Sequence, residues 1–111
     1  MNRDLDRLYD MLDSIENIQK YTENRELNQL NELEQAGIVH FLQIIGEASR
    51  ALTTEFREKY NDINWVEIIA FRNILVHQYS NVDMDIVSRI IERDIPYFKE
   101  KVQSLIKKIE V

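Results

Sequence analysis

The sequence predicts an all-α fold, an antiparallel up-and-down bundle of four main helices and one short helix. Two observations favour this fold. Apolar residues recur at three- and four-residue spacing along most of the chain, as they do on one face of a helix. The 111 residues include only two glycines and one proline, too few for the many tight turns of a sandwich or barrel. A chain of this length forms one domain, which we expect to cover residues 1–111.

The first two predicted helices cover about residues 2–21 and 28–52, with the polar residues 22–25 between them. The stripe of the first consists of Leu5, Leu8, Leu12, Ile15 and Ile18. The stripe of the second consists of Leu30, Leu33, Gly37, Ile38, Phe41, Ile45 and Ala48. A glycine inside a helix costs about 1 kcal/mol relative to alanine. We therefore expect neighbouring helices to approach closely at Gly37 and Gly46.

The later helices are predicted from their capping residues. Thr53 and Thr54 can cap a short helix that ends near Tyr60. Asn64, with Glu67 to complete a capping box, begins a fourth helix over residues 65–78. This helix is apolar on nearly every side, which is typical of the centre of a domain or of an interface.

The last predicted helix begins after Asp83 and ends near Glu110. Its apolar stripe consists of Val87, Ile91, Ile95, Phe98, Val102, Leu105 and Ile109. Pro96 removes one backbone hydrogen bond, so we expect a kink near Glu92.

Composition excludes several classes of function. The absence of cysteine excludes disulfides, thiolate zinc sites, iron–sulfur clusters and cysteine nucleophiles. Two glycines cannot build a glycine-rich phosphate loop. The first residues turn acidic without an apolar run, and no later run approaches the roughly 20 residues that span a bilayer, so the expected location is the cytoplasm. A net charge of −6 argues against a broad basic surface for nucleic acid.

The fourth predicted helix carries four polar side chains on one half of its surface: Arg72, Asn73, His77 and Tyr79. Asn73 and His77 are one turn apart. Arginine is almost never fully buried without a partner, so this face must meet a cleft, a carboxylate or another subunit. If a carboxylate pairs with Arg72, Glu47 on the second predicted helix is the candidate.

This string of residues resembles the R-x4-H-x-Y signature of the HEPN superfamily, in its HepT branch of toxins from toxin–antitoxin systems. Three other segments are similar to that family and extend the resemblance over nearly the whole chain. Residues 45–48 read I-G-E-A. Residues 63–65 read I-N-W, with Asn64 where the family usually has proline. Val82-Asp83 and Ile95-Pro96 match the last helix of the family.

The resemblance implies a metal-independent endoribonuclease that acts on tRNA or mRNA without a cofactor. It implies a homodimer in which Arg72 and His77 of both subunits form one composite cleft. Asn73 is similar to a supporting position of the family. Apart from the resemblance, the expected packing of the second helix near the fourth would let Glu47 orient Arg72 or line the cleft. Tyr79 is similar in position to the tyrosine that a cognate MntA-type nucleotidyltransferase antitoxin adenylylates, which implies a covalent off-switch.

The residue types themselves suit this chemistry. Cleavage of RNA without metal uses the adjacent 2′-OH as the nucleophile. Histidine moves protons near neutral pH, so His77 would be the general base or acid. Arginine keeps its charge and grips two phosphate oxygens, so Arg72 would stabilise the phosphorane. Two-fold symmetry would supply the second histidine that acid and base together require. The expected products are a cyclic phosphate and a 5′-hydroxyl.

Two alternatives remain open at this point. The chain could be a non-catalytic helical partner of a minimal nucleotidyltransferase, which its acidic charge favours, or a bundle whose only role is oligomerisation. The remaining candidates have structural interpretations. We expect His40 to be a packed or surface histidine, and Tyr60 and Trp65 to be core residues. The chain has no E-x-x-H sequence, which argues against a ferritin-like di-metal site.

Overall fold

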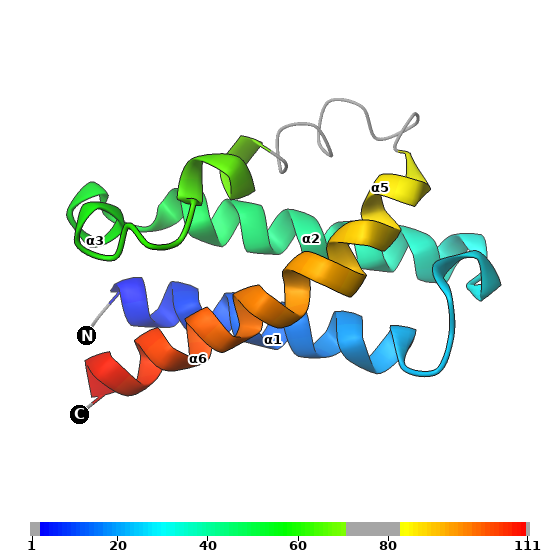
Figure 1. Cartoon of the computed structure of the whole chain (residues 1–111), viewed down its shortest axis with the longest axis horizontal. Helices are drawn as coiled ribbons and strands as arrows, with labels where there is room; N and C mark the ends of the chain where they lie inside the picture. Colours follow the sequence, from blue (N-terminus) through cyan, green and yellow to red (C-terminus); the bar gives the residue numbers. More distant parts are fainter. Residues whose placement is uncertain (1–2, 71–82, 111) are drawn as a thin grey trace.

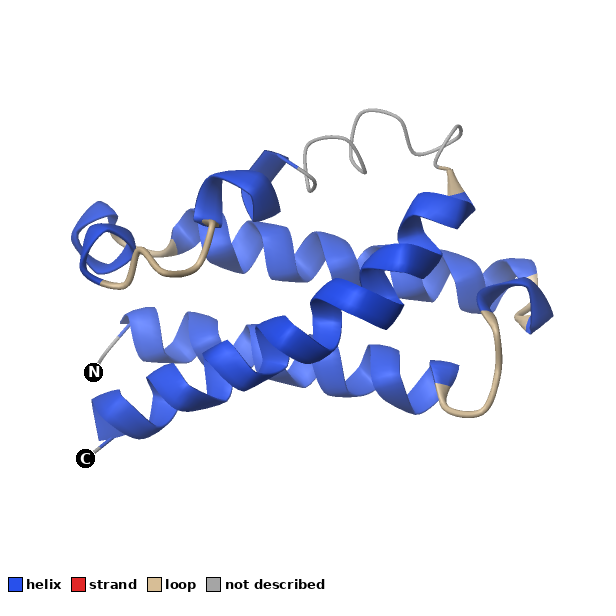
Figure 2. Ribbon diagram, viewed as in Figure 1, coloured by secondary structure: helices blue, strands red, loops and turns tan. Residues whose placement is uncertain are grey.

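The computed structural model describes residues 3–70 and 83–110. The chain folds as an all-helical protein, as predicted, with no strand among these residues. Consecutive long helices reverse direction, and both ends of the chain lie at the same end of the bundle (Figures 1 and 2). No helix in these two ranges is long and apolar enough to cross a membrane.

Helix α1 (Arg3–Thr22) packs against α2 (Glu32–Ala51) and α6 (Ile95–Glu110). Its predicted stripe is confirmed, because Leu8, Ile15 and Ile18 are fully buried and Leu5 and Leu12 pack against them. Burial of such side chains contributes roughly 1.5–3 kcal/mol each. The stripe of α1 is therefore the centre of the core.

The start of the second helix differs from the prediction. Residues Leu27–Gln29 form a 3₁₀ turn, and α2 begins only at Glu32. The cause is a capping box at Asn31: its Oδ1 accepts from the Glu34 N–H at 2.8 Å, and Glu34 Oε1 accepts from the Asn31 N–H at 3.1 Å. These bonds satisfy the first free amides of α2 and fix its start.

Two expectations within α2 were wrong. Leu33 was placed on the apolar stripe, but it is 82% exposed. Gly37 was expected at a close helix–helix contact, yet a Cβ added there would meet nothing within 4 Å. Gly46 is buried, as are Ile38, Ile45 and Ala48. The buried face of α2 is thus turned away from Leu33 and Gly37.

The short helix α3 (Thr54–Lys59) has the predicted cap. Thr53 Oγ1 accepts from the Phe56 N–H at 3.1 Å. The same threonine is held by α1, because its N–H and hydroxyl both donate to the Asp4 carboxylate, at 2.9 and 3.0 Å. The start of α3 is therefore fixed to the start of α1.

The fourth helix is described over residues 65–70 alone. Trp65 is buried, but Val66 is 78% exposed and Ala70 is also exposed. This turn has one side in the core, through Trp65 and Ile68, and one side exposed, through Val66 and Ala70. Exposed apolar residues fit an interface.

The last predicted helix is divided. Asp83 caps α5 (Met84–Arg89), the five residues Ile90–Asp94 form a π-helical turn (η3), and α6 follows. The sequence predicted a kink near Glu92, and the structure has the π-helical turn at that position, because Pro96 cannot donate to the Glu92 carbonyl and the backbone widens there. Val87, Ile95, Phe98, Val102 and Leu105 are buried as predicted, and Ile91 and Ile109 pack at the edge.

Candidate functional site

The four motif residues Arg72, Asn73, His77 and Tyr79 lie outside the described residues. The structure does describe the segments that precede and follow them. These two segments and the neighbouring part of α2 show how the fold holds both ends of the motif.

The segment before the motif is anchored by Trp65. Its indole is buried, and Nε1 donates to the Tyr60 carbonyl at 3.1 Å. The indole also packs against the rings of Phe56 and Phe98, with centroids 6.5 and 6.2 Å away. Trp65 is therefore a core residue, as predicted, and Tyr60 is half-buried against the same cluster. This cluster fixes where the fourth helix leaves the core.

Asn64 caps that helix, as predicted. Its Oδ1 accepts from the Glu67 N–H at 3.1 Å, and its carbonyl accepts from the Ile68 N–H at 3.3 Å. Asparagine is a strong N-cap residue, because its side chain satisfies an amide that the helix itself leaves free. The asparagine that replaces the usual proline of the family therefore still begins the helix.

The segment after the motif is anchored by α5. Asp83 Oδ1 accepts from the Asp85 N–H at 2.9 Å, and the Asp83 carbonyl accepts from the amides of Ile86 and Val87. Val87 is fully buried. Capping bonds and a buried side chain thus hold the chain on both sides of residues 71–82.

The I-G-E-A segment lies on α2 with a clear division of roles. Ile45, Gly46 and Ala48 are buried, whereas Glu47 is exposed. The three small or apolar residues set the packing of α2, and Glu47 is the one that can reach other groups. Its predicted pairing with Arg72 stays a prediction, since Arg72 lies outside the described ranges.

His40, the other histidine of the chain, is an exposed residue of α2. Its ring lies 6.2 Å from that of Phe41, centroid to centroid. The prediction of a packed or surface histidine is confirmed. Within residues 3–70 and 83–110, no cluster of three histidine or carboxylate side chains could hold a metal ion.

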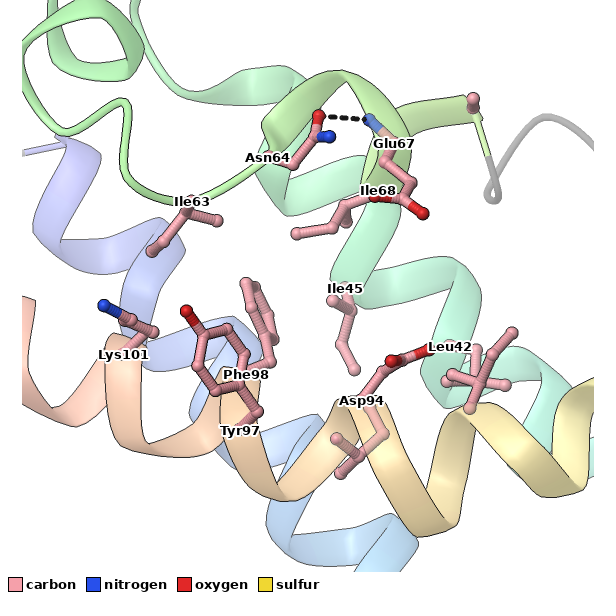
Figure 3. A pocket seen from close by; sticks show the side chains of 13 residues that line it. Leu42, Ile45, Ile63, Asn64, Glu67, Ile68, Asp94, Tyr97, Phe98 and Lys101 are labelled. Carbon is pink, nitrogen blue, oxygen red and sulfur yellow. Dashed lines mark hydrogen bonds between the residues drawn. The ribbon is translucent and has the colours of Figure 1, made fainter.

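A groove that the sequence did not predict lies beside the start of the fourth helix (Figure 3). Its volume is about 490 Å³, and it separates residues 63–70 and α2 from η3 and α6. Its lining is mainly apolar, with Leu42, Ile45, Ile63, Ile68, Ala70, Ile90, Ile95 and Phe98. Ala70 lies two residues before Arg72 in the chain.

Polar groups stand around this groove. Asn64, Glu67, Asp94, Tyr97 and Lys101 contribute to its lining. Lys101 Nζ donates to Asp62 Oδ2 at 3.0 Å and lies 5.5 Å from the centre of the Tyr97 ring. The hydrogen bond from Lys101 lowers the pKa of Asp62, and the same bond raises the pKa of Lys101. A signal for the groove was present in the sequence, since Tyr97 is a large aromatic outside the apolar stripe; it is 57% exposed.

Known proteins are similar in sequence to this chain over most of its length. A sequence model of the family described as "Ribonuclease HepT-like" matches residues 11–105, which include the complete motif. The chain belongs to the HepT-like ribonuclease family. This confirms the resemblance found in the motif.

Individual relatives agree with the HepT-like assignment. The chain is 35% identical over 98 residues to a protein of Methanocaldococcus jannaschii named "Putative RNase MJ1380", covering 86% of this chain and 90% of that protein. It is 31% identical over 102 residues to the "Probable ribonuclease HepT" of Thermococcus cleftensis, covering 90% of this chain and 93% of that protein. No solved structure gives a significant match.

Proposed function

We propose that this HepT-like chain is the toxin of a toxin–antitoxin system and cleaves RNA without a metal ion. One observation carries the proposal. The family match covers residues 11–105 and therefore includes Arg72 and His77, the residue types that metal-free RNA cleavage needs. The names of the relatives support a ribonuclease.

The proposed reaction is an attack of the 2′-oxygen on the adjacent phosphorus. The P–O bond to the 5′-oxygen breaks, which leaves a 2′,3′-cyclic phosphate and a 5′-hydroxyl. His77 of one subunit takes the proton from the 2′-OH, and His77 of the second subunit gives a proton to the leaving oxygen. Arg72 binds the phosphate oxygens as negative charge develops. Asn73 and Glu47 would hold Arg72 in position.

The proposed control of this reaction is covalent. A cognate nucleotidyltransferase antitoxin would transfer AMP to the hydroxyl of Tyr79. In the sequence Tyr79 stands seven residues after Arg72, nearly two helical turns. The added bulk and negative charge beside Arg72 would exclude the RNA phosphate.

The test is cleavage of a labelled tRNA pool in the presence of EDTA. Wild-type protein and the His40→Ala variant should cleave, whereas His77→Ala should be inactive. The two substitutions are matched, because these are the two histidines of the chain and His40 is an exposed residue that is not part of the motif sequence. Loss of activity in EDTA would contradict the metal-free mechanism.

A different result would favour the second candidate. Wild-type protein that cleaves no RNA, with an unmodified mass for Tyr79, would indicate a non-catalytic partner of a nucleotidyltransferase. The net charge of −6 is the observation that favours this alternative, because RNA substrates carry many phosphates.

A further inference from the structure

The groove between residues 63–70, α2 and η3–α6 has the shape and composition of a binding site. A volume of about 490 Å³ falls in the range of ligand sites, and a mainly apolar lining with a few polar groups is also typical of them. It can accept a short row of apolar side chains.

The free charges of the groove are negative. Glu67 and Asp94 approach it from opposite walls, and Figure 3 shows the Asp94 carboxylate directed toward Leu42 and Ile45. Neither carboxylate makes an ion pair among the residues that the structure describes. The cation of the lining, Lys101, is already paired with Asp62 at 3.0 Å. An occupant therefore meets apolar walls and two carboxylates that have no ion-pair partner in residues 3–70 and 83–110; such carboxylates repel phosphate and attract cations.

A second copy of the chain does not offer the matching surface in its described part. The apolar stripes of α1, α2 and α6 are buried in the core of each copy. The large apolar residues that stay exposed there do not form a stripe on one helix: Tyr9, Tyr21, Leu33, Val66, Ile86 and Tyr97. Within residues 3–70 and 83–110, a second copy therefore supplies no complementary stripe, and the charges of the groove indicate the occupant.

We propose that the groove binds an amphipathic helix of a partner protein, with apolar residues in the groove and lysine or arginine beside Glu67 and Asp94. An apolar stripe at i, i+3, i+4 and i+7 is the usual way for a helix to occupy such a groove. The basic residues on either side of that stripe give the interaction its specificity and speed its association. Ala70 is part of the lining and stands two residues before Arg72 in the chain, so this partner lies close to the start of the motif in the sequence.

The probe is a fluorescein-labelled amphipathic helical peptide made of leucine and lysine, measured by fluorescence anisotropy against the full chain. A peptide with glutamate in place of every lysine is its control. Binding of the lysine peptide and not of the glutamate peptide is expected. Asp94→Lys and Glu67→Lys should each weaken binding about tenfold or more, since each places a like charge against the peptide.

The matched control separates the groove from general attraction to an acidic protein. Glu16→Lys on the exposed face of α1 changes the net charge by the same amount and lies outside the groove. It should leave affinity within about twofold of the wild type. Equal weakening by Glu16→Lys and Asp94→Lys would overturn the proposal, as would equal binding of the two peptides.

Methyl NMR of the isoleucines gives a second readout that does not depend on any substitution. Addition of the lysine peptide should shift Ile68 and Ile90, which line the groove, and leave Ile15 and Ile18 in the α1 core unchanged. Shifts confined to other residues would also overturn the proposal. Neither measurement uses RNA cleavage, so the result stands apart from the ribonuclease function.

Discussion

Two leucines of α2 show how exposure decides the effect of a substitution. Leu42 is 3% exposed and Leu33 is 82% exposed. Leu42→Ala should lower the free energy of unfolding by roughly 2–5 kcal/mol, because it removes buried methyl groups and leaves a cavity. Leu33→Ala should change it by less than about 0.5 kcal/mol. Urea unfolding followed by circular dichroism measures both, and equal effects would contradict the buried face described for α2.

The sequence predicted individual buried residues correctly where the apolar positions of a helix lie on one face, and it failed where they lie on more than one face. The stripe of α1 has one phase throughout, and all of it packs in the core. In α2 the apolar residues are spread more widely around the helix, so spacing could not decide between Leu33 and Leu42. The motif residues were found by their chemical type and spacing. Their geometry depends on contacts that no local pattern records.

Thr53 joins the helices α1 and α3 through its side chain and its backbone N–H. Its hydroxyl oxygen accepts from the Phe56 N–H, and its N–H and hydroxyl donate to Asp4 of α1. Thr53→Ala should lower the free energy of unfolding by about 1 kcal/mol, since it removes the cap of α3. Thr54→Ala, at the exposed neighbouring position, is the matched control and should be close to neutral. A thermal melt compares the two, and an equal loss of stability would exclude the cap as the cause.

The sequence predicted the helix boundaries that depend on local hydrogen bonds and missed the one that depends on tertiary packing. Thr53, Asn64 and Asp83 are caps that depend on bonds to the next few residues, and each was predicted. The start of α2 was missed because Leu30 is buried although it precedes the helix, so the apolar spacing continued across the boundary. The groove was missed because it requires three separate segments to meet in space.

At the scale of the whole molecule, acid should weaken the fold through two carboxylates. Hydrogen bonding to the Asn31 backbone, and then Arg25, lowers the pKa of Glu34, while Lys101 lowers the pKa of Asp62. A lowered pKa in the folded state stabilises the fold above the unfolded values of 4.5 and 3.8. This contribution disappears as pH falls through the folded values.

The Glu34→Gln and Asp62→Asn variants test this dependence. The urea concentration at the unfolding midpoint of the wild type should decrease when the pH is lowered below about 4.5. Each variant should show a smaller decrease, because it has lost one of the contributing carboxylates. The change should be small, since both groups lie at the surface. Glu16→Gln removes an exposed carboxylate with no ion pair among the described residues and is the control. An acid dependence identical in all four proteins would exclude these two groups as its source.

The last prediction concerns the assembly that the proposed ribonuclease requires. One chain supplies one motif histidine, His77, whereas acid and base catalysis in the same step need two. If the second comes from a two-fold partner, the monomer lacks a complete site. The cleavage rate per chain should then fall on dilution, because mass action separates the dimer. Sedimentation at the same concentrations gives the dimer fraction, and the rate per chain should follow it in proportion. A rate per chain that stays constant while the protein becomes monomeric would show that a single subunit holds the whole site, and a different residue would then have to supply the second proton transfer.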